Sequence, residues 1–525
     1  MASCDALFTR LYTGLTPDYS QSRDDSPAAA PGGGFDRLSR STYMASPLSL
    51  RLLPLLLAAG LTACVSVGPD YRAPAVAVPP AWQAPSPDAS AAATAPDSLA
   101  NWWERLADPQ LSALVADALA ANPDLDAARA ALRAARASRD AASAQRAPSV
   151  GASGGVTRST ALGGERTLYD AGFDAAWELD VFGGLRRAVE AADADSAAAL
   201  ADLRATRVSL VAEVALNYID LRAAQMRLAI ARANLESQSE TLQITQWRSQ
   251  AGLASALDVE QARSNRESTR AQIPTLATGR AAAEHRLAVL TGRAPGSLHE
   301  VLAVADGARA GLLPVLPASV GVSIPAEALR QRPDITAAER RLAAATARVG
   351  QAEAARYPSF SLGGSIGLQA LGLSTFTGGG QVARSLAASV SGPVFDAGRL
   401  RAQVEVQDAL REQQLAAYRK AVLGALEDVQ NALVALSDTR LREQALTGAA
   451  DAARNAALYA RHRYASGLID FQTVLSTERS LLTIEDNLAS AEAARLTALV
   501  QLYKALGGGW APGDSTETHA PESTP

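Results

Sequence analysis

The chain is poor in aromatic residues and in cysteine, and positive charge is not in excess. Aromatic residues make up 5% of the 525 residues, and the formal net charge is −5 at pH 7. Two cysteines, Cys4 and Cys64, cannot form a disulfide framework. The acidic balance gives no reason to expect a nucleic-acid partner. Together these features exclude a disulfide-stapled domain and a basic nucleic-acid binder.

Residue patterns that support catalysis or metal binding are also missing. The sequence shows no nucleophile–base pair and no glycine-rich phosphate loop. The histidines are scattered, with no cysteine or carboxylate at ligand spacing: His285, His299, His462 and His519. We therefore expect no metal site, no cofactor and no enzymatic activity. Alanine is abundant on the helical stretches instead, and small side chains let helices pack closely over long distances.

A long helical rod from Gly183 to Ala251 is the dominant feature of the chain. No proline interrupts it, and at about 1.5 Å per residue a helix of roughly 67 residues is about 100 Å long. Apolar residues recur within it at seven-residue spacing, a pattern typical of a coiled coil. They are Leu200, Val214, Leu221, Leu228, Leu235 and Leu242. A tight turn and a shorter helix ending near Gly292 follow the rod.

Two segments before the rod alternate with a period of two, which predicts β-strands. They are Val150–Val156 and Tyr169–Val181, and in the second one face is aromatic and aliphatic while the other is acidic. A strand of about ten residues can cross an outer membrane at a tilt. A soluble β-sandwich produces the same alternation, so a single strand leaves both possibilities open.

The whole pattern then occurs a second time. Asn122-Pro123-Asp124 matches Arg332-Pro333-Asp334, and Ala251-Gly252-Leu253 matches Ser466-Gly467-Leu468. The second copy has strands near 360–368 and 386–394, a rod from Gly398 to Ala465 and a return helix from Ile469 to Leu506. The sequence therefore predicts a duplicated helix-strand-strand-helix-helix repeat. In each copy the first helix and the return helix together match the rod in length, so they should stack end to end beside it.

The N-terminal region carries the features of an exported lipoprotein. Met44 precedes a short positive region at Arg51 and an apolar run from Leu52 to Leu61, which is too short to span a membrane and fits a signal peptide. The Leu-Thr-Ala-Cys ending resembles a bacterial lipobox, with cleavage before Cys64 and lipidation of its thiol. Val65 rather than aspartate follows the cysteine, which favours export to the outer membrane.

These observations divide the chain into seven parts. Residues 1–43 are expected to be a non-native or disordered extension, 44–63 a lipoprotein signal peptide, and 64–100 a lipid-anchored tether rich in proline and alanine. The first repeat spans 101–300, a linker 301–325 and the second repeat 326–506. Residues 507–525 are expected to form a disordered tail.

Four strands in one chain are too few to close a membrane barrel, since the smallest such barrels have about eight. An open sheet in lipid would leave backbone hydrogen-bonding groups unsatisfied at its edges. The chain should therefore oligomerise symmetrically, with eight strands as a dimer or twelve as a trimer.

Several duplicated motifs resemble those of outer-membrane efflux proteins, in the OprM- and NodT-like lipoprotein branch of the TolC superfamily. They are Asn122-Pro123-Asp124-Leu125, Val181-Phe182-Gly183-Gly184, the stretch from Trp247 to Leu253 and the stretch from Arg463 to Leu468. The resemblance implies an α+β membrane fold in which a trimeric 12-stranded transmembrane β-barrel is continuous with a long α-helical periplasmic barrel. It also implies a lipid-anchored outer-membrane channel that conducts passively. Its partners would be a periplasmic adaptor and an inner-membrane pump, commonly proton-driven.

The resemblance also assigns roles at the two glycine turns. Gly252, Leu253, Gly467 and Leu468 match positions that adaptors contact, although glycine in a plain helical hairpin would give the same pattern. Arg463 and Tyr464 match a pair that holds the gate closed, with Asp258 of a neighbouring tip as a partner; a solvated helix face is the alternative. Gln472 and Ser476 stand where relatives carry an apolar residue and an aspartate, so a narrowing ring of carboxylates is not expected there.

Two other functions compete with an efflux channel. A lipid-anchored periplasmic coiled coil could act as a spacer, but a spacer has no use for two-faced strands. An outer-membrane channel for type I protein secretion would share the same architecture. Within the efflux interpretation, drugs and metal ions are both possible cargoes, because the pump rather than this chain selects what is exported.

Overall fold

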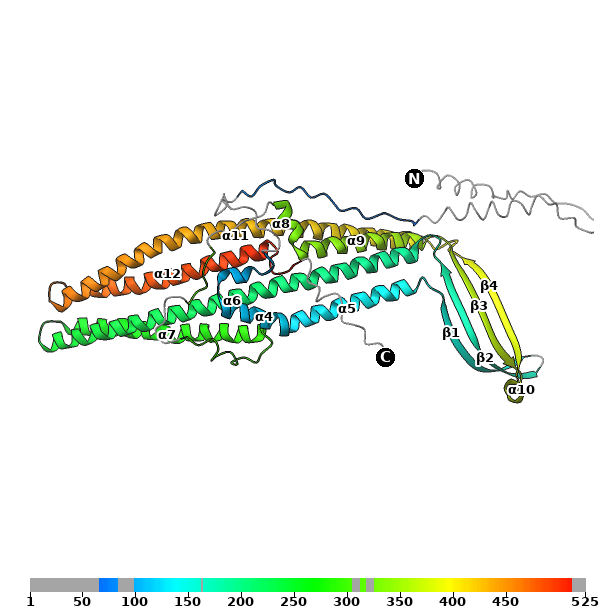
Figure 1. Ribbon diagram of the computed structural model, residues 1–525, viewed down its shortest axis with the longest axis horizontal. Coiled ribbons are helices and arrows are strands. Elements are labelled where there is room, and N and C mark those ends of the chain that lie inside the picture. The colour runs from blue at the N-terminus through cyan, green and yellow to red at the C-terminus, as the bar shows by residue number, and fades with distance from the viewer. Residues whose placement is uncertain (1–65, 84–98, 162–163, 305–311, 318–324, 512–525) are drawn as a thin grey trace, which may run out of the picture. The chain divides into compact units, whose positions relative to one another are not determined.

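The computed structural model describes residues 66–83, 99–161, 164–304, 312–317 and 325–511. The predicted leader, its start at Met44 and the lipidation site Cys64 lie outside these residues. The described residues all belong to one compact unit, Ala63–Pro525. Its strands form one sheet next to the helix ends, and the turns between the long helices lie at the opposite ends of those helices (Figure 1).

The predicted order of elements is confirmed. The first repeat contains η1 (Trp102–Leu106), α4 (Pro109–Ala121), α5 (Pro123–Ala144), β1 (Ser149–Ala161), β2 (Gly164–Leu179), α6 (Gly184–Gln250) and α7 (Ala256–Leu290). The second contains α8 (Pro325–Gln331), α9 (Pro333–Ala354), β3 (Ser359–Ala370), α10 (Leu373–Thr377), β4 (Gln381–Ser391), α11 (Arg399–Ala465) and α12 (Phe471–Ala505).

The two repeats match in helix length. Both rods, α6 and α11, have 67 residues, both return helices, α7 and α12, have 35, and both α5 and α9 have 22. The short helices η1, α8 and α10 were not predicted, because segments of five to seven residues show no usable periodicity.

The four strands form one antiparallel sheet in the order β1-β2-β3-β4. β4 begins at Gln381, earlier than its apolar alternation predicted, because pairing of Gln381 with Gln369 extends the ladder. Between β2 and β3 the backbones approach closely at Gly172 and Gly367. A Cβ atom at either glycine would lie 2.7 Å from a carbonyl oxygen of the facing strand, so neither position has room for a side chain.

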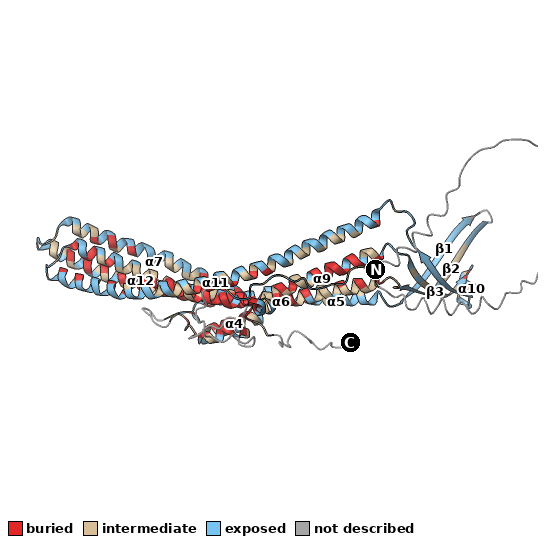
Figure 2. Ribbon diagram, turned by 90° about the horizontal axis from the view of Figure 1, so that it is seen from above, coloured by how far each residue is buried: buried red, intermediate tan, exposed pale blue. Residues whose placement is uncertain are grey.

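The predicted heptad stripe of α6 faces the protein interior. Val214, Leu221, Leu228 and Leu242 are buried, while Leu200 and Leu235 are partly buried. The rod packs against α5, α7, α9 and α12. The largest core lies around the middle of the helices, where buried residues gather in Figure 2. There Trp102 stacks on Tyr503, with ring centroids 5.2 Å apart.

Asn122 joins two helices end to end in the first repeat. Its Nδ2 donates to the carbonyl oxygen of Leu290, the last residue of α7, at 2.9 Å. Its Oδ1 accepts from the backbone nitrogens of Asp124 and Leu125, the first turn of α5. One buried side chain therefore satisfies the C-terminus of one helix and the N-terminus of the next.

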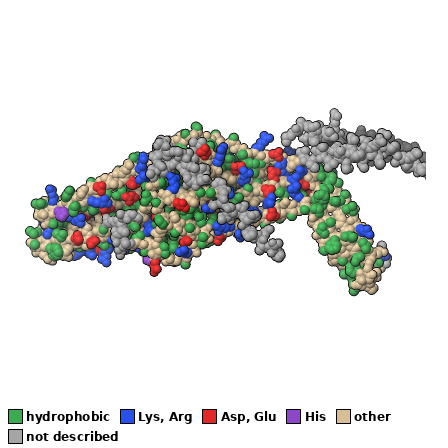
Figure 3. Space-filling view, in the orientation of Figure 1, with side chains coloured by type: hydrophobic (Ala, Val, Ile, Leu, Met, Phe, Trp, Pro, Cys, Tyr) green, Lys and Arg blue, Asp and Glu red, His purple; other side chains and the backbone are tan. Residues whose placement is uncertain are grey.

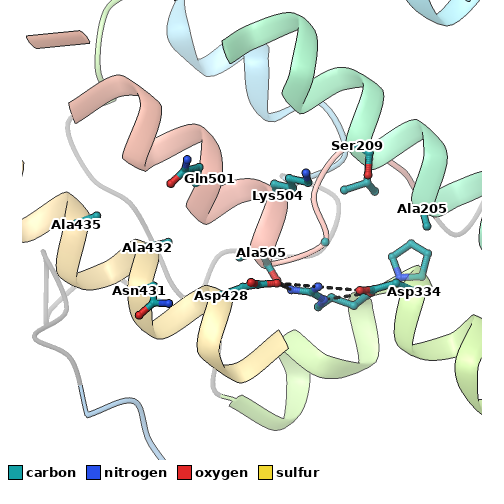
Figure 4. Close-up of a pocket in the computed structure, with 14 residues that line it drawn as sticks. Ala205, Ser209, Asp334, Asp428, Asn431, Ala432, Ala435, Gln501, Lys504 and Ala505 are labelled. Carbon is teal, nitrogen blue, oxygen red and sulfur yellow. Dashed lines mark hydrogen bonds and ion pairs between the residues drawn. The ribbon is translucent and has the colours of Figure 1, made fainter. Parts of the chain in front are cut away.

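Arg332 holds the corresponding position in the second repeat. Its guanidinium donates to the carbonyl oxygen of Ala505, the last residue of α12, at 3.0 Å. It also pairs with Asp334 at 2.7 Å and with Asp428 at 3.1 Å, beside a cavity of about 500 Å³ (Figure 4). The expected end-to-end stacking is thus present in both repeats, through different side chains.

The glycine after each return helix fits tightly against the joint. Gly292 and Gly507 both have positive φ, +70° and +78°. A Cβ atom at Gly292 would lie 2.2 Å from the carbonyl oxygen of Ala121, and one at Gly507 would lie 2.9 Å from that of Gln331. Only glycine satisfies both the backbone conformation and the space.

The predicted disordered tail is wrong for its first five residues. Gly507, Gly508 and Gly509 are buried, and the backbone nitrogen of Gly509 donates to Leu99 O at 2.9 Å. The indole Nε1 of Trp510 donates to the carbonyl oxygen of Gln331 at 3.1 Å. The glycine run serves close packing here, although its composition alone resembles that of a flexible segment.

Part of the predicted tether lies against the helices. Arg187 at the start of α6 donates to Asp70 Oδ1 at 2.7 Å and to the carbonyl oxygen of Val67 at 3.2 Å. Gly68 crosses α9 so closely that a Cβ atom there would lie 2.3 Å from the Cα of Gly350. Residues 66–83 therefore have a defined path beside the helical body (Figure 1).

Replacing Asn122 with alanine should destabilise the helical body. The substitution removes the cap of α5 and leaves the buried Leu290 carbonyl without its donor, at a combined cost of about 2 kcal/mol in the free energy of unfolding. Asn122→Ser keeps a capping oxygen but cannot reach Leu290, so it should cost less. Chemical unfolding of the detergent-solubilised protein measures both; equal stability of all three forms would contradict the role of the joint.

Candidate functional site

The sheet has one apolar and one polar face. The register pairs Phe173 with Ile366 and Trp177 with Leu362, and these residues share their face with most of the sheet's other large apolar side chains. The opposite face carries Asp170, Asp174, Glu178 and the serines of β3 and β4. Two serine pairs bridge those strands by hydrogen bonds, Ser361 with Ser389 at 2.6 Å and Ser365 with Ser385 at 2.7 Å.

The apolar face is exposed in the single chain. Leu386 is 81% exposed and Val150 71%. In the view of Figure 3 the sheet presents mostly hydrophobic side chains, while the helices carry both charge signs along their length. Trp177 and Tyr169 lie eight residues apart on β2, which is about 26 Å along the strand. An apolar band of about this height between aromatic residues is typical of a membrane-crossing strand.

Both edges of the sheet are open. Within the described part of the chain, β1 pairs only with β2 and β4 only with β3. The sheet-proximal part of α11 is open as well: none of residues 401–421 is buried, and Val406 is 55% exposed. The equivalent part of α6 buries Ala191, Ala198 and Leu203. The second repeat therefore lacks, in one chain, a neighbour that the first repeat has.

The predicted tip residues lie on two equivalent turns. Gly252 and Gly467 adopt positive φ, +74° and +75°. The following leucine nitrogens donate back to the rods, Leu253 to Arg248 O at 2.7 Å and Leu468 to Arg463 O at 2.8 Å. Both leucine side chains project into solvent, with 68% and 72% exposure. The two turns thus present a pair of apolar side chains at the ends of the hairpins.

The two predicted gate residues on α11 have different environments. Tyr464 is buried, and the guanidinium of Arg248 lies 4.6 Å over its ring and donates to its carbonyl oxygen at 2.5 Å. Arg463 is exposed, and its side chain has no ion-pair partner among the described residues. Sequence reasoning missed Arg248, although its spacing marks it as the repeat equivalent of Arg463.

The remaining predicted gate residues make contacts within the chain. Asp258 forms a capping box with Ser255, its carboxylate accepting from the Ser255 nitrogen at 3.0 Å. Gln472 Nε2 donates to Gln261 Oε1 at 2.5 Å and so links α12 to α7. Ser476 Oγ donates to the carbonyl oxygen of its own helix at Thr473. A contact of Asp258 with a neighbouring tip stays a prediction.

A polar row between α6 and α12 was also missed by sequence reasoning. Thr241 Oγ1 donates to Glu478 Oε1 at 2.6 Å, and Asn234 Nδ2 donates to Glu485 Oε2 at 3.3 Å. Glu478 is only 4% exposed. Burial raises the pKa of its carboxyl group, against the opposing effects of the Thr241 hydrogen bond and of Arg461. These side chains interrupt otherwise apolar stripes, a signal available in the sequence but without a direction.

The described residues contain no group of three or more histidine, cysteine, aspartate or glutamate side chains that could hold a metal ion. Among the described helices, none combines the length and the apolar character that crossing a membrane requires.

The solved structures that this chain resembles are outer-membrane channels. The outer-membrane channel OprN is 39% identical, with a TM-score of 0.77, and the match covers 85% of this chain and 100% of that one. CusC is 29% identical, with a TM-score of 0.74, and the match covers 85% of this chain and all of the other. The fold therefore defines the class of protein, an outer-membrane channel with a TolC-like architecture.

Sequence comparison gives the family. The family model of the outer membrane efflux protein matches residues 114–293 and 324–508. The pyoverdine export outer membrane protein OpmQ of Pseudomonas putida is 35% identical over 89% of this chain and 98% of its own length. Outer membrane protein OprJ of Pseudomonas aeruginosa is 33% identical over 89% and 97%. This chain belongs to the outer membrane efflux protein family, which confirms its expected location and transport class.

Glu478→Gln should remove a pH dependence from the stability of the tip. Because the folded chain holds the proton of Glu478 more tightly, its stabilising effect is full below the ordinary pKa of 4.5 and is lost as pH rises through the raised value. Glutamine keeps the hydrogen bond from Thr241 without the buried charge, so it should add roughly 1 kcal/mol above that window.

Hydrogen exchange of α12 amides across this pH range measures the effect. Glu260→Gln is the control, because Glu260 is exposed on α7 and pairs with Arg263. An identical pH profile for wild type and Glu478→Gln would contradict the prediction.

Proposed function

We propose that three copies of this chain form an outer-membrane channel through which substrates delivered by a pump pass without further energy input. The observation that carries the proposal is the two-faced sheet with two open edges. β1 and β4 run in opposite directions, so β4 of one copy can pair antiparallel with β1 of the next. Three copies would close twelve strands and leave no unpaired edge in lipid.

The helices support the same closure. In one chain α9 lies between α6 and α11, whereas α5 contacts α6 alone of the two rods. The exposed sheet-proximal part of α11, residues 401–421, would pack on α5 of a neighbouring copy. A ring built in this way repeats one type of helix contact around a central axis. Family membership favours the trimer over the dimer that strand number alone allows.

The two sheet faces would then meet two solvents. The apolar face, with Phe173 and Leu386, would contact lipid, and the polar face, with Asp170 and Asp174, would line a water-filled passage. The helices would extend this passage through the periplasm as a continuous α-helical barrel. Relatives named for pyoverdine export, toluene efflux and cation efflux resemble this chain over most of its length, which supports selection of cargo by other components.

The tips would be both the docking surface and the gate. The exposed leucines Leu253 and Leu468 would contact a periplasmic adaptor, which in turn would couple the channel to an inner-membrane pump, commonly proton-driven. Arg463 would pair across copies with Asp258, while Tyr464 would brace the tip from inside. Surface ion pairs contribute about 0–1 kcal/mol each, which suits contacts that must break on opening. Lipidation of Cys64 would anchor the chain, and incorporation of labelled palmitate tests it.

Conductance tests the channel and its gate. Purified full-length protein should be trimeric by mass and should give small, mostly closed conductance in planar bilayers. Arg463→Ala should raise the conductance several-fold, because it removes a contact between copies without disturbing the buried Tyr464. Arg442→Ala is the control, since Arg442 is also exposed on α11 but lies far from the tip. A monomeric protein, or no conductance from any variant, would sink the proposal.

Co-purification tests the assembly. Replacing both Leu253 and Leu468 with glutamate should abolish recovery of the adaptor with the affinity-tagged channel, because charge replaces the exposed apolar contact. Val315→Glu provides a matched control, as Val315 is 66% exposed but lies in the linker. Undiminished adaptor recovery with the double variant would remove the turns from the docking surface.

A further inference from the structure

Two arginines interrupt the apolar face of the sheet. The register places Arg384 of β4 opposite Ile366, and Arg158 of β1 opposite Thr167. Both therefore lie on the face that carries Phe173 and Leu386. Each is three residues from the strand end remote from the helices, Ala161 for β1 and Gln381 for β4.

The two arginines differ in their present partners. Among the described residues no carboxylate lies within ion-pair distance of Arg384, and its neighbours on this face, Val382 and Leu386, are apolar and exposed. Arg158 is held by Glu165, which accepts from its Nε at 2.5 Å and its Nη2 at 2.7 Å. A charge on a lipid-facing strand is unfavourable unless it reaches head-group depth and meets an opposite charge.

Aromatic side chains mark that depth. Tyr169 of β2 lies near Phe376 of α10, with ring centroids 6.5 Å apart, beyond the end of β3. Aromatic residues gather where a membrane protein crosses the lipid–water interface. An arginine side chain can extend along the strand toward this level while its stem stays among apolar groups.

Within one chain the two arginines are far apart. β1 and β4 are opposite edges of the sheet, separated by three strand spacings of about 4.8 Å, or about 14 Å. Closure of the ring would reverse this relation, because β4 of one copy would lie beside β1 of the next. Arg384 and a neighbouring copy's Arg158 would then share one outward surface on adjacent strands, each three residues from its outer end.

We propose that each junction between copies binds the phosphorylated head group of an outer-leaflet glycolipid, through Arg384 of one copy and Arg158 of the next. The inference rests on the proposed function, which supplies both the junction and the outward direction of the strand ends. Arginine suits this ligand because its planar guanidinium donates two parallel hydrogen bonds to phosphate oxygens. The uncompensated charge of Arg384 provides the attraction, and the surrounding apolar side chains match the acyl chains.

The test measures binding of bisphosphorylated lipid A to the purified full-length trimer in detergent. Native mass spectrometry should count three tightly bound lipids per trimer. Arg384→Gln and Arg158→Gln should each weaken binding about tenfold, the loss expected for a charge-assisted contact. Arg166→Gln should bind as wild type, because Arg166 lies on the same hairpin but its register partner, Ser159, places it on the polar face. Lipid A lacking both phosphates should bind weakly to every form.

Three results would overturn the inference: unchanged affinity in Arg384→Gln, equal weakening in Arg166→Gln, or equal binding of dephosphorylated lipid A. If Arg384→Gln fails to assemble, Arg384→Lys keeps the charge, and it should retain most of the affinity if the site is real. A trimer that conducts but binds no lipid A selectively refutes the site alone. Wild-type protein that neither trimerises nor conducts refutes the proposed function.

Discussion

The helical body depends on two joints at which a pair of shorter helices is stacked end to end beside each rod. A helix end leaves several backbone groups without partners, and burying two ends together is costly unless side chains satisfy them. Asn122 meets this constraint with one amide, and Arg332 meets it with one guanidinium flanked by Asp334 and Asp428. Gly292 and Gly507 let the chain leave each joint without a steric conflict. Continuous helical layers as long as the rods follow from these contacts.

The sheet is subject to a different constraint, which the single chain does not meet. Its outward face is apolar, its inward face is polar, and both edges have free hydrogen-bonding groups. The proposed ring resolves all three conditions at once, because further copies supply the missing strands. The same closure would give α11 the neighbour that α6 already has. Membership in the outer membrane efflux protein family is consistent with this arrangement.

Much of the fold could be predicted because its signals are local. The heptad of α6, the alternation of Tyr169–Val181 and the glycine turns each depend on residues close together in the chain. The site was less accessible. Arg248 stacks on Tyr464, which lies on the other long helix, and the burial of Glu478 depends on how α12 faces α6. No local pattern specifies such cross-helix partners. The buried run Gly507–Gly509 was misjudged for the same reason, since its composition resembles that of a flexible tail.

By itself the sequence determined the duplication, the order and lengths of the helices, the two faces of each strand and the positions of the turns. These follow from periodicity, capping and backbone preference, which act over a few residues. Only the tertiary structure decided that Arg332 replaces Asn122 at the second joint, that Tyr464 is buried while Arg463 is exposed, and that Arg158 and Arg384 lie at opposite edges of one face. Those outcomes depend on which surfaces meet in space, and residues far apart in the chain decide that.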